Sequence, residues 1–254
     1  MARENVADIL CVGTQKAGTS WLHTMCNVHP RTYSFPNRRP VTSTNKEAHF
    51  FDWNPYKGVD WYRELLTPQQ PDKLSMDFTP EYSLLTRGHI KLCRTLSPSA
   101  KVFYIVRDPV ARAISALRMH YLWQESSPEN MVEIVFDDKF LKIFQEARIV
   151  NFSGYVATVS LWREFYPDLH VLNYEDTLTD PREFILGVWE KIGLRHSELG
   201  EEKEKLFDEK LKTKVWESKK YKIAPQVIDY LNTVLQPHKE FAQRELGVKF
   251  KEQS

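Results

Sequence analysis

The chain has 254 residues, of which 42% are hydrophobic and 27% are charged. This composition excludes an intrinsically disordered chain and allows a buried core, and the length fits one α/β domain covering residues 1–254. Lys and Arg total 35 against 34 Asp and Glu, so the formal net charge is +1. A protein whose whole surface binds nucleic acid would be far more basic, so only a local basic site remains open.

The sequence carries no segment typical of a membrane span or a disulfide framework. No apolar run approaches the roughly 18 residues of a membrane helix, and the first eight residues carry charges where a secretory signal would be apolar. The cysteines Cys11, Cys26 and Cys93 are too few, and odd in number, for a disulfide framework. We therefore expect a reduced cytoplasmic protein, with a trimmed lumenal catalytic domain as the alternative.

Short apolar strands alternate with helices along the chain. In chain order, the patterns predict a strand at 7–13, a helix at 19–29, a loop at 31–46, a strand at 73–78, a helix at 80–96, a strand at 101–106, helices at 109–123 and 153–166, a strand at 169–172, and helices at 181–192 and 225–246, the last with Pro237 as a candidate break. This alternation predicts a P-loop-like α/β fold, with a mostly parallel sheet and helices on both faces. Ligands of such sheets bind beyond the carboxyl ends of the strands.

A glycine loop joins the first predicted strand to the first helix. Gly13 and Gly18 have the spacing of a phosphate-binding loop, in which glycine lets an anion approach the backbone and the helix N-terminus offers N–H donors. Thr19 stands where the usual G-x-x-x-x-G-K-[ST] loop has its lysine, and Lys16 lies inside the loop instead. We expect a site for one phosphate and a neighbouring transferable group, without an obligatory metal. The alternative is a strand–helix turn with a solvated lysine.

A second motif follows the strand predicted at 101–106. Arg107 would emerge at the carboxyl end of that strand, where a guanidinium makes a forked contact with a phosphate, and Ser115 adds a hydroxyl. Asp108 and Pro109 fit the cap and the first turn of the next helix. The alternative for Arg107 is an ion pair with a local carboxylate.

Together, T-Q-K-A-G-T-S-W-L after the first strand and I-V-R-D-P-V-A-R-A-I-S after the third resemble the sulfotransferase family. The resemblance implies 3′-phosphoadenosine 5′-phosphosulfate (PAPS) as sulfuryl donor and 3′-phosphoadenosine 5′-phosphate (PAP) as product. It implies that Arg107 and Ser115 hold the 3′-phosphate. It assigns the 5′-phosphosulfate to Lys16, Ala17, Gly18, Thr19, Ser20 and Trp21.

Two further segments resemble the heparan sulfate glucosaminyl 3-O-sulfotransferase branch of that family. The stretch from Lys46 to Trp53 resembles its E-x-H-F-F-D-W segment, which implies Glu47 as the catalytic base with His49 in reserve. The alternatives are a surface carboxylate and a hydrogen-bonded core histidine. The stretch 217–222 resembles a basic loop that covers the cofactor. The residues it assigns to cofactor binding are Lys219, Lys220, Tyr221 and Lys222.

One departure from that branch bears on the acceptor. Phe78 stands where the branch has a lysine, in its V-E-K-T-P segment. The basic loop 31–46 contains Arg38 and Arg39, which we expect to face an anionic acceptor, although a solvated basic loop is an equal alternative. Asp77 and Tyr155 are weaker candidates for lining the acceptor site.

We therefore predict a sulfotransferase that moves a sulfuryl group from PAPS to an acceptor hydroxyl, with a carbohydrate as the favoured class. The transfer would be in line, with Lys16 stabilising the leaving phosphate, Glu47 taking the proton and no metal required. One alternative is a nucleotide kinase or hydrolase, against which the missing GK[ST] lysine argues. The other is a non-catalytic PAP-binding module, against which the presence of Lys16 and Glu47 argues.

Overall fold

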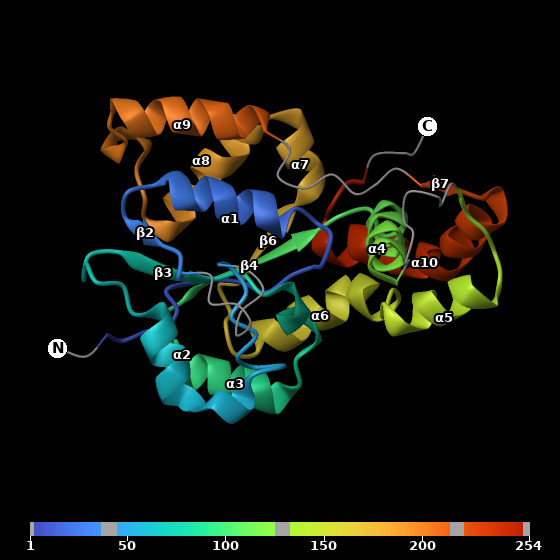
Figure 1. Ribbon diagram of the computed structural model, residues 1–254, viewed down its shortest axis with the longest axis horizontal. Helices are drawn as coiled ribbons and strands as arrows, with labels where there is room; N and C mark the ends of the chain where they lie inside the picture. The colour runs from blue at the N-terminus through green and yellow to red at the C-terminus, as the bar shows by residue number, and fades with distance from the viewer. Residues whose placement is uncertain (1–2, 37–44, 125–132, 214–220, 251–254) are drawn as a thin grey trace.

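The computed structural model describes residues 3–36, 45–124, 133–213 and 221–250. Its centre is a parallel five-stranded sheet in the order β2-β3-β1-β4-β6 (Figure 1). The strands are β1 (Ile9–Cys11), β2 (Thr32–Tyr33), β3 (Leu74–Asp77), β4 (Lys101–Val106) and β6 (His170–Asn173). A separate parallel pair consists of β5 (Glu133–Ile134) and β7 (Lys222–Ile223).

Alternate side chains of the inner strands enter two different apolar clusters. In β4, Val102 and Tyr104 point into one cluster, whereas Phe103 and Ile105 point into the other. This period of two follows from the pleat of the strand. Because both faces are covered, β1 and β4 are apolar almost throughout, as is typical of parallel sheets.

Helices cover both faces of the sheet, as the sequence predicted (Figure 1). The cluster on one face contains side chains of α1 (Thr19–Val28), α8 (Pro181–Ile192) and α9 (Glu201–Lys212). The other face packs on α2 (Gly58–Leu66), α3 (Arg87–Leu96) and α6 (Tyr155–Arg163). A third cluster joins α4 (Pro109–Gln124), α5 (Asp138–Glu146) and α10 (Pro225–Leu246).

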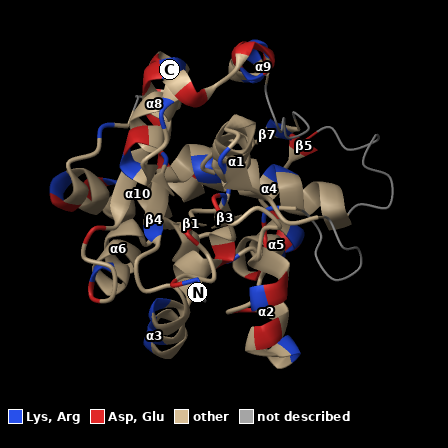
Figure 2. Cartoon of the chain, turned by 90° about the vertical axis from the view of Figure 1, so that its left-hand side faces the viewer, with Lys and Arg blue, Asp and Glu red and all other residues tan. Residues whose placement is uncertain are grey.

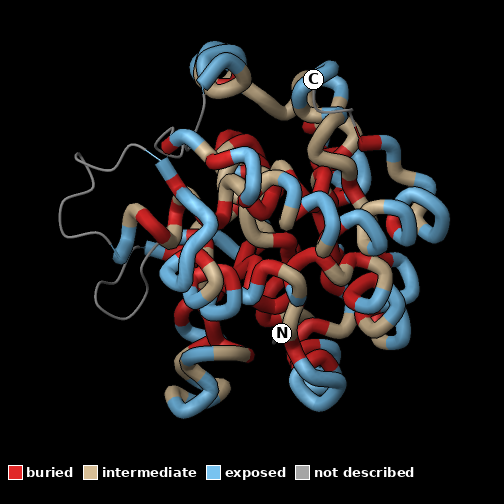
Figure 3. The backbone as a smooth tube through the Cα atoms, turned by 90° about the vertical axis from the view of Figure 1, so that its right-hand side faces the viewer, coloured by how far each residue is buried: buried red, intermediate tan, exposed pale blue. Residues whose placement is uncertain are grey.

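The remaining short elements are η1 (Pro55–Lys57), η2 (Pro80–Leu84), η3 (Asn151–Ser153), α7 (Tyr174–Thr179) and η4 (His196–Glu198). Buried residues lie through the middle of the molecule and exposed residues on the outer helices (Figure 3). Outer helices such as α2 and α9 carry both signs of charge (Figure 2). Cys11, Cys26 and Cys93 are buried and free. In the part of the chain that the structure describes, no helix combines the length and apolarity needed to cross a bilayer.

Three predictions about elements were wrong. The chain expected to form one helix at 80–96 forms η2 and then α3, and the backbone oxygen of Tyr82 accepts bonds from Leu85 N and Trp162 Nε1 at the junction. Pro237 does not break α10, because buried Leu235 and Ala242 hold the helix on both sides of it. The predicted loop 31–46 contains β2, which pairs with β3.

Candidate active site

The parallel sheet brings four strand ends to one edge. Four neighbouring strands of the sheet run in the same direction, in the order β3, β1, β4 and β6. The chain leaves β1 into the glycine loop, β4 into Arg107 and β6 into Tyr174. The carboxyl end of β3 carries Asp77, which holds the segment 46–53. Motifs far apart in the sequence therefore meet at one edge.

Two glycines shape the loop 13–18. Gly13 has φ 143°, and a Cβ there would lie 2.8 Å from the Ser83 Cβ. Gly18 has φ 91°, and a Cβ there would lie 3.0 Å from the Tyr174 ring. Only glycine combines these angles with this lack of space. No side chain caps the start of α1, so its first N–H groups stay available to an anion.

Lys16 lies inside this loop with φ 67°. Its backbone oxygen accepts a hydrogen bond of 2.9 Å from the Arg107 Nη1, which ties the two sequence motifs together. Burial, with the charges of Arg107 and Lys46, lowers the pKa of the Lys16 ammonium to about 8. An anion bound here would relieve the repulsion among these cations and restore the charged form of Lys16.

Arg107 is fixed from both sides. Its backbone oxygen accepts a bond of 2.8 Å from the Tyr155 hydroxyl, and its guanidinium lies 4.4 Å from the centre of the Tyr174 ring. Asp108 is not its partner: that carboxylate caps α4 through Ala111 N at 2.9 Å and pairs with Lys239 Nζ at 2.8 Å. Within the described residues, the buried Arg107 Nε has no hydrogen-bond partner, which fits a role in binding an anion and disfavours the alternative of a local ion pair.

The segment 46–53 is anchored to the end of β3. Phe78 N donates to the Lys46 backbone oxygen at 2.7 Å, and Ala48 N donates to an Asp77 carboxylate oxygen at 3.1 Å. These bonds place Glu47 between two cationic groups. One Glu47 oxygen contacts the Lys46 Nζ, and the other lies 3.6 Å from the His49 Nε2.

His49 connects Glu47 to a second carboxylate. Its Nδ1 lies 2.8 Å from Asp52 Oδ2, and its ring stacks on Trp53 at 3.6 Å between centroids. Burial would lower the pKa of His49, but hydrogen bonds to Asp52 and Glu47 raise it to about 9. Burial would raise the pKa of Glu47, but Lys46 and His49 lower it to about 2. At neutral pH the group is therefore a charged chain of carboxylate, imidazolium and carboxylate.

The structure brings several predicted residues together and places others elsewhere. Glu47 is not a surface carboxylate, because only 18% of its side chain is exposed to solvent. His49 is buried and hydrogen-bonded, as its alternative predicted, but it also faces Glu47. Ala17 and Thr19 are buried, whereas Ser20, Trp21 and Ser115 are half-buried. Tyr221 is buried, with its backbone oxygen bound by Arg118 Nε, and Lys222 is exposed at the start of β7. Arg38, Arg39, Lys219 and Lys220 lie outside the described residues.

Asp77 and Tyr155 occupy positions that differ from the expected acceptor surface. Asp77 is fully buried and accepts bonds from Ala48 N and from the hydroxyls of Thr79, Tyr62 and Tyr82. Tyr155 is 1% exposed and binds the backbone of Arg107. Both side chains hold backbone groups of the site in place: Asp77 binds Ala48 N, and Tyr155 binds the Arg107 oxygen. Buried backbone groups need such hydrogen-bond partners.

Sequence reasoning gave Lys46 only as part of the basic loop expected to face the acceptor, and it missed Asp52, Trp53 and Tyr174 as members of the site. Lys46, Asp52 and Trp53 lie within or beside the motif around Glu47, so their position there was the available signal. Tyr174 follows β6, and only the pairing of β6 with β4 brings it to Arg107 and Gly18.

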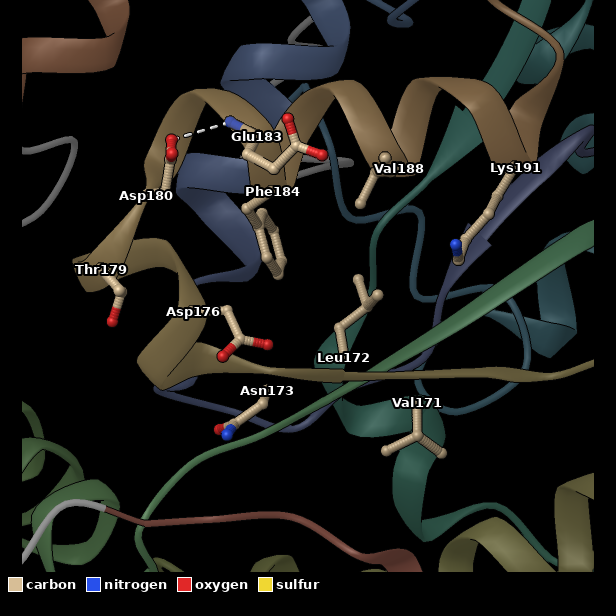
Figure 4. Close-up of a pocket in the computed structure, with 11 residues that line it drawn as sticks. Val171, Leu172, Asn173, Asp176, Thr179, Asp180, Glu183, Phe184, Val188 and Lys191 are labelled. Carbon is tan, nitrogen blue, oxygen red and sulfur yellow. Dashed lines mark hydrogen bonds between the residues drawn. The ribbon is translucent and has the colours of Figure 1, made fainter.

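A cavity of about 360 Å³ lies elsewhere, between β6, α7 and α8 (Figure 4). Asp176, Asp180 and Glu183 line it, with Lys191 farther along α8. The Asp180 carboxylate is engaged in capping α8 through Glu183 N at 2.9 Å. Lys16, Glu47 and Arg107 are not among its lining residues, so it is separate from the candidate active site.

The fold and the site define a class: a P-loop-like α/β protein in which a lysine-containing glycine loop lies beside an arginine at the end of the neighbouring strand. The chain belongs to the sulfotransferase family, because the family model described as the sulfotransferase domain matches residues 7–251. This confirms the family resemblance predicted from the sequence.

Curated relatives include heparan sulfate glucosamine 3-O-sulfotransferases. The human 3-O-sulfotransferase 5 is 25% identical over 179 residues, which are 68% of this chain and 49% of the relative. The human 3-O-sulfotransferase 6 is 27% identical over 195 residues, 76% of this chain and 54% of the relative. The chain thus matches about half the length of these relatives.

Solved sulfotransferases share the fold. A sulfotransferase from Alicyclobacillus acidocaldarius has a TM-score of 0.69 at 19% identity, covering 98% of both chains. The mouse sulfotransferase SULT7A1, solved in complex with PAP, has a TM-score of 0.52 at 15% identity, covering 96% of this chain and 90% of that one. The predicted fold class is confirmed.

Proposed function

We propose that this protein is an O-sulfotransferase that uses PAPS as donor and a carbohydrate hydroxyl as acceptor. The observation that carries the proposal is the meeting of Lys16, Arg107 and Glu47 at one edge of the sheet. Two cations on neighbouring strand ends suit a donor with anionic groups at two points. A half-buried carboxylate beside them suits removal of a proton from an acceptor hydroxyl.

The residues present fit the donor. Arg107 and Ser115 would hold the 3′-phosphate, and the orphaned Arg107 Nε supports this role. The loop from Lys16 to Trp21 would hold the 5′-phosphosulfate, because the lack of a side chain at Gly18 lets an anion approach the backbone N–H groups. Lys222 and Tyr221, with Lys219 and Lys220, would cover the nucleotide. When bound, PAPS supplies an activated sulfuryl group on a phosphate leaving group.

The chain's own residues would supply the rest of the chemistry. Glu47 accepts the acceptor proton, and His49, held by Asp52, orients the Glu47 carboxylate. The Lys16 ammonium meets the negative charge that grows on the leaving phosphate. Because these groups are fixed by the sheet and the anchored segment, little reorganisation is needed at the moment of transfer.

Trp53 supports a carbohydrate acceptor. Its ring stacks on His49 on one side, yet 58% of the residue is exposed, so an aromatic surface remains open beside the proposed base. Sugar rings present C–H faces that pack on such surfaces. The names of the curated relatives point to the same acceptor class. We keep an anionic carbohydrate as the favoured acceptor, with Arg38 and Arg39 as its proposed contacts.

A screen for transfer of radiolabelled sulfate from PAPS to polysaccharides, glycolipids and small hydroxyl compounds tests this proposal. We expect product with at least one carbohydrate class, unchanged by a metal chelator, because the site offers ammonium and backbone donors for the leaving charge. Magnesium-dependent turnover of ATP that PAP does not inhibit would contradict the proposal and favour a nucleotide kinase or hydrolase.

A further inference from the structure

Lys46 is a buried lysine to which the proposed transfer assigns no role. It is 8% exposed, and its Nζ contacts the Glu47 carboxylate. A lysine is rarely this buried, because removing an ammonium from water is costly unless nearby groups offset the cost. Its burial beside the proposed base therefore calls for a function.

The backbone fixes Lys46 at the edge of the sheet. Its carbonyl oxygen accepts the bond from Phe78 N, directly after β3. Phe78 itself is fully buried, and its ring packs edge-on against His23.

The charge of Lys46 acts on several groups of the site. It contributes to the lowered pKa values of Lys16 and of His23, and to that of Glu47. The charge of Lys46 thus acts on both the lysine of the glycine loop and the proposed base. Among the described residues, Lys46 Nζ contacts the Glu47 carboxylate. A second anion placed near Lys16 would compete with the Glu47 carboxylate for the Lys46 ammonium.

We propose that Lys46 is a donor-responsive catalytic residue, which leaves the Glu47 carboxylate and turns to the sulfuryl oxygens when PAPS binds. This inference rests on the proposed function. In the transfer, the acceptor oxygen forms a bond to sulfur while its proton passes to Glu47. The bond between sulfur and the 5′-phosphate oxygen breaks, and its electron pair stays on the phosphate of PAP.

The exchange makes the base depend on the donor. A carboxylate held by an ammonium and an imidazolium has little affinity for a proton, so it is a weak general base. Departure of Lys46 raises the affinity of Glu47 for a proton. His49 remains in contact with Glu47, and His23 and Glu81 also interact with it electrostatically. Glu47 would thereby become an effective base only after the donor has arrived.

Carbon-13 NMR of the glutamate carboxyl groups tests this exchange directly. The Glu47 signal is assigned by its loss in Glu47→Gln, and its titration is compared without ligand, with PAP and with PAPS, in the absence of acceptor. We expect PAPS to raise the proton affinity of Glu47 about tenfold or more above its value with PAP. An unchanged titration in the presence of bound PAPS would overturn the proposal.

Variants give a second measurement. Lys46→Met should lower kcat about 100-fold and weaken PAPS about tenfold relative to PAP, because only PAPS carries the sulfuryl group. The Glu47 titration in this variant should no longer respond to PAPS. Lys46→Arg, which keeps the charge, should retain a larger share of the preference for PAPS over PAP. Equal losses of PAPS and PAP affinity in Lys46→Met would contradict a contact with the sulfuryl group.

Failure of this inference is distinguishable from failure of the proposed function. If neither PAP nor PAPS produces heat on calorimetric titration of the wild-type protein, the donor assignment itself is wrong. If both bind and sulfate is transferred while Glu47 titrates identically with either, only the role of Lys46 is wrong. The wild-type titration needs no substitution, so the test holds even if Lys46→Met does not fold.

Discussion

The glycine loop and the Glu47 segment meet at the same edge of the sheet but are held there by different means. The loop is shaped by backbone: two glycines with positive φ and hydrogen bonds to β4. The Glu47 segment is shaped by side chains, with Asp77 beneath it and the chain of Asp52, His49 and Glu47 within it. The comparison suggests that donor binding tolerates changes in the Glu47 segment, whereas transfer needs both regions.

The largest expected effect is that of Lys16→Ala. Removing the ammonium that meets the leaving charge should lower the transfer rate about 1000-fold or more at saturating PAPS. Lys205→Ala, which removes an exposed lysine paired with Glu201 on α9, is the matched control and should keep wild-type turnover. Radiolabelled sulfate transfer measures both. Normal turnover in Lys16→Ala would remove its assigned role.

Glu47→Gln separates the two regions. It should lower kcat about 100-fold while leaving the dissociation constant of PAP unchanged, because the donor loop does not depend on the Glu47 side chain for its shape. Steady-state rates and calorimetry measure the two quantities. If His49→Ala alone abolishes transfer and Glu47→Gln retains it, the base is His49.

The pH dependence of stability tests the charged chain in the Glu47 segment. The pKa of His49 is raised to about 9 from the ordinary value of 6.5, so the folded state holds its proton more tightly. The resulting stability is complete below about pH 6.5 and is lost as the pH rises through about 9. The difference in melting temperature between wild type and His49→Gln should therefore shrink between pH 6 and pH 9.5, as thermal denaturation can measure.

Lys16 also contributes to the pH dependence of stability, and comparing wild type with His49→Gln cancels that contribution. The lowered Lys16 pKa of about 8 acts in the opposite direction, since deprotonation of a half-buried ammonium favours the folded state as the pH rises. That contribution is common to both proteins. A melting-temperature difference that stays constant across the range would contradict the ion contacts of His49.

Trp53→Ala should have the smallest effect and should confine it to the acceptor. Loss of the exposed ring beside His49 removes about 0.5–1.5 kcal/mol of aromatic packing, so the acceptor KM should rise roughly three- to tenfold with PAP affinity unchanged. Trp123→Ala on α4, where 62% of the residue is exposed, is the control. An unchanged acceptor KM would remove Trp53 from the acceptor site.

The meeting of the glycine loop with Arg107 could be predicted from the sequence because each of the two motifs is local. Gly13, Lys16 and Gly18 lie in one short stretch after a strand, and Arg107 directly follows β4, which is the longest strand in the described part of the chain. Parallel pairing of β1 with β4 then brings them together. The central sheet was predictable for the same reason, since buried parallel strands show as apolar runs.

The Glu47 region could be predicted only in part. Asp77 was expected to face the acceptor, but its four hydrogen bonds are made by residues from three separate stretches. Tyr174 reaches Arg107 only through the order of strands. Tertiary packing likewise keeps α10 continuous through Pro237. Each of these features depends on contacts between distant residues, which no local pattern encodes.

Calorimetric titration with PAP tests the central claim, that one anionic nucleotide is held between the glycine loop and Arg107. We predict that wild type and Arg87→Ala, which alters an exposed arginine paired with Glu164, bind PAP alike. Arg107→Ala should bind it about 2–5 kcal/mol more weakly, because a half-buried charged contact is lost. Absence of binding heat in the wild-type protein, or equal dissociation constants for all three proteins, would contradict the account.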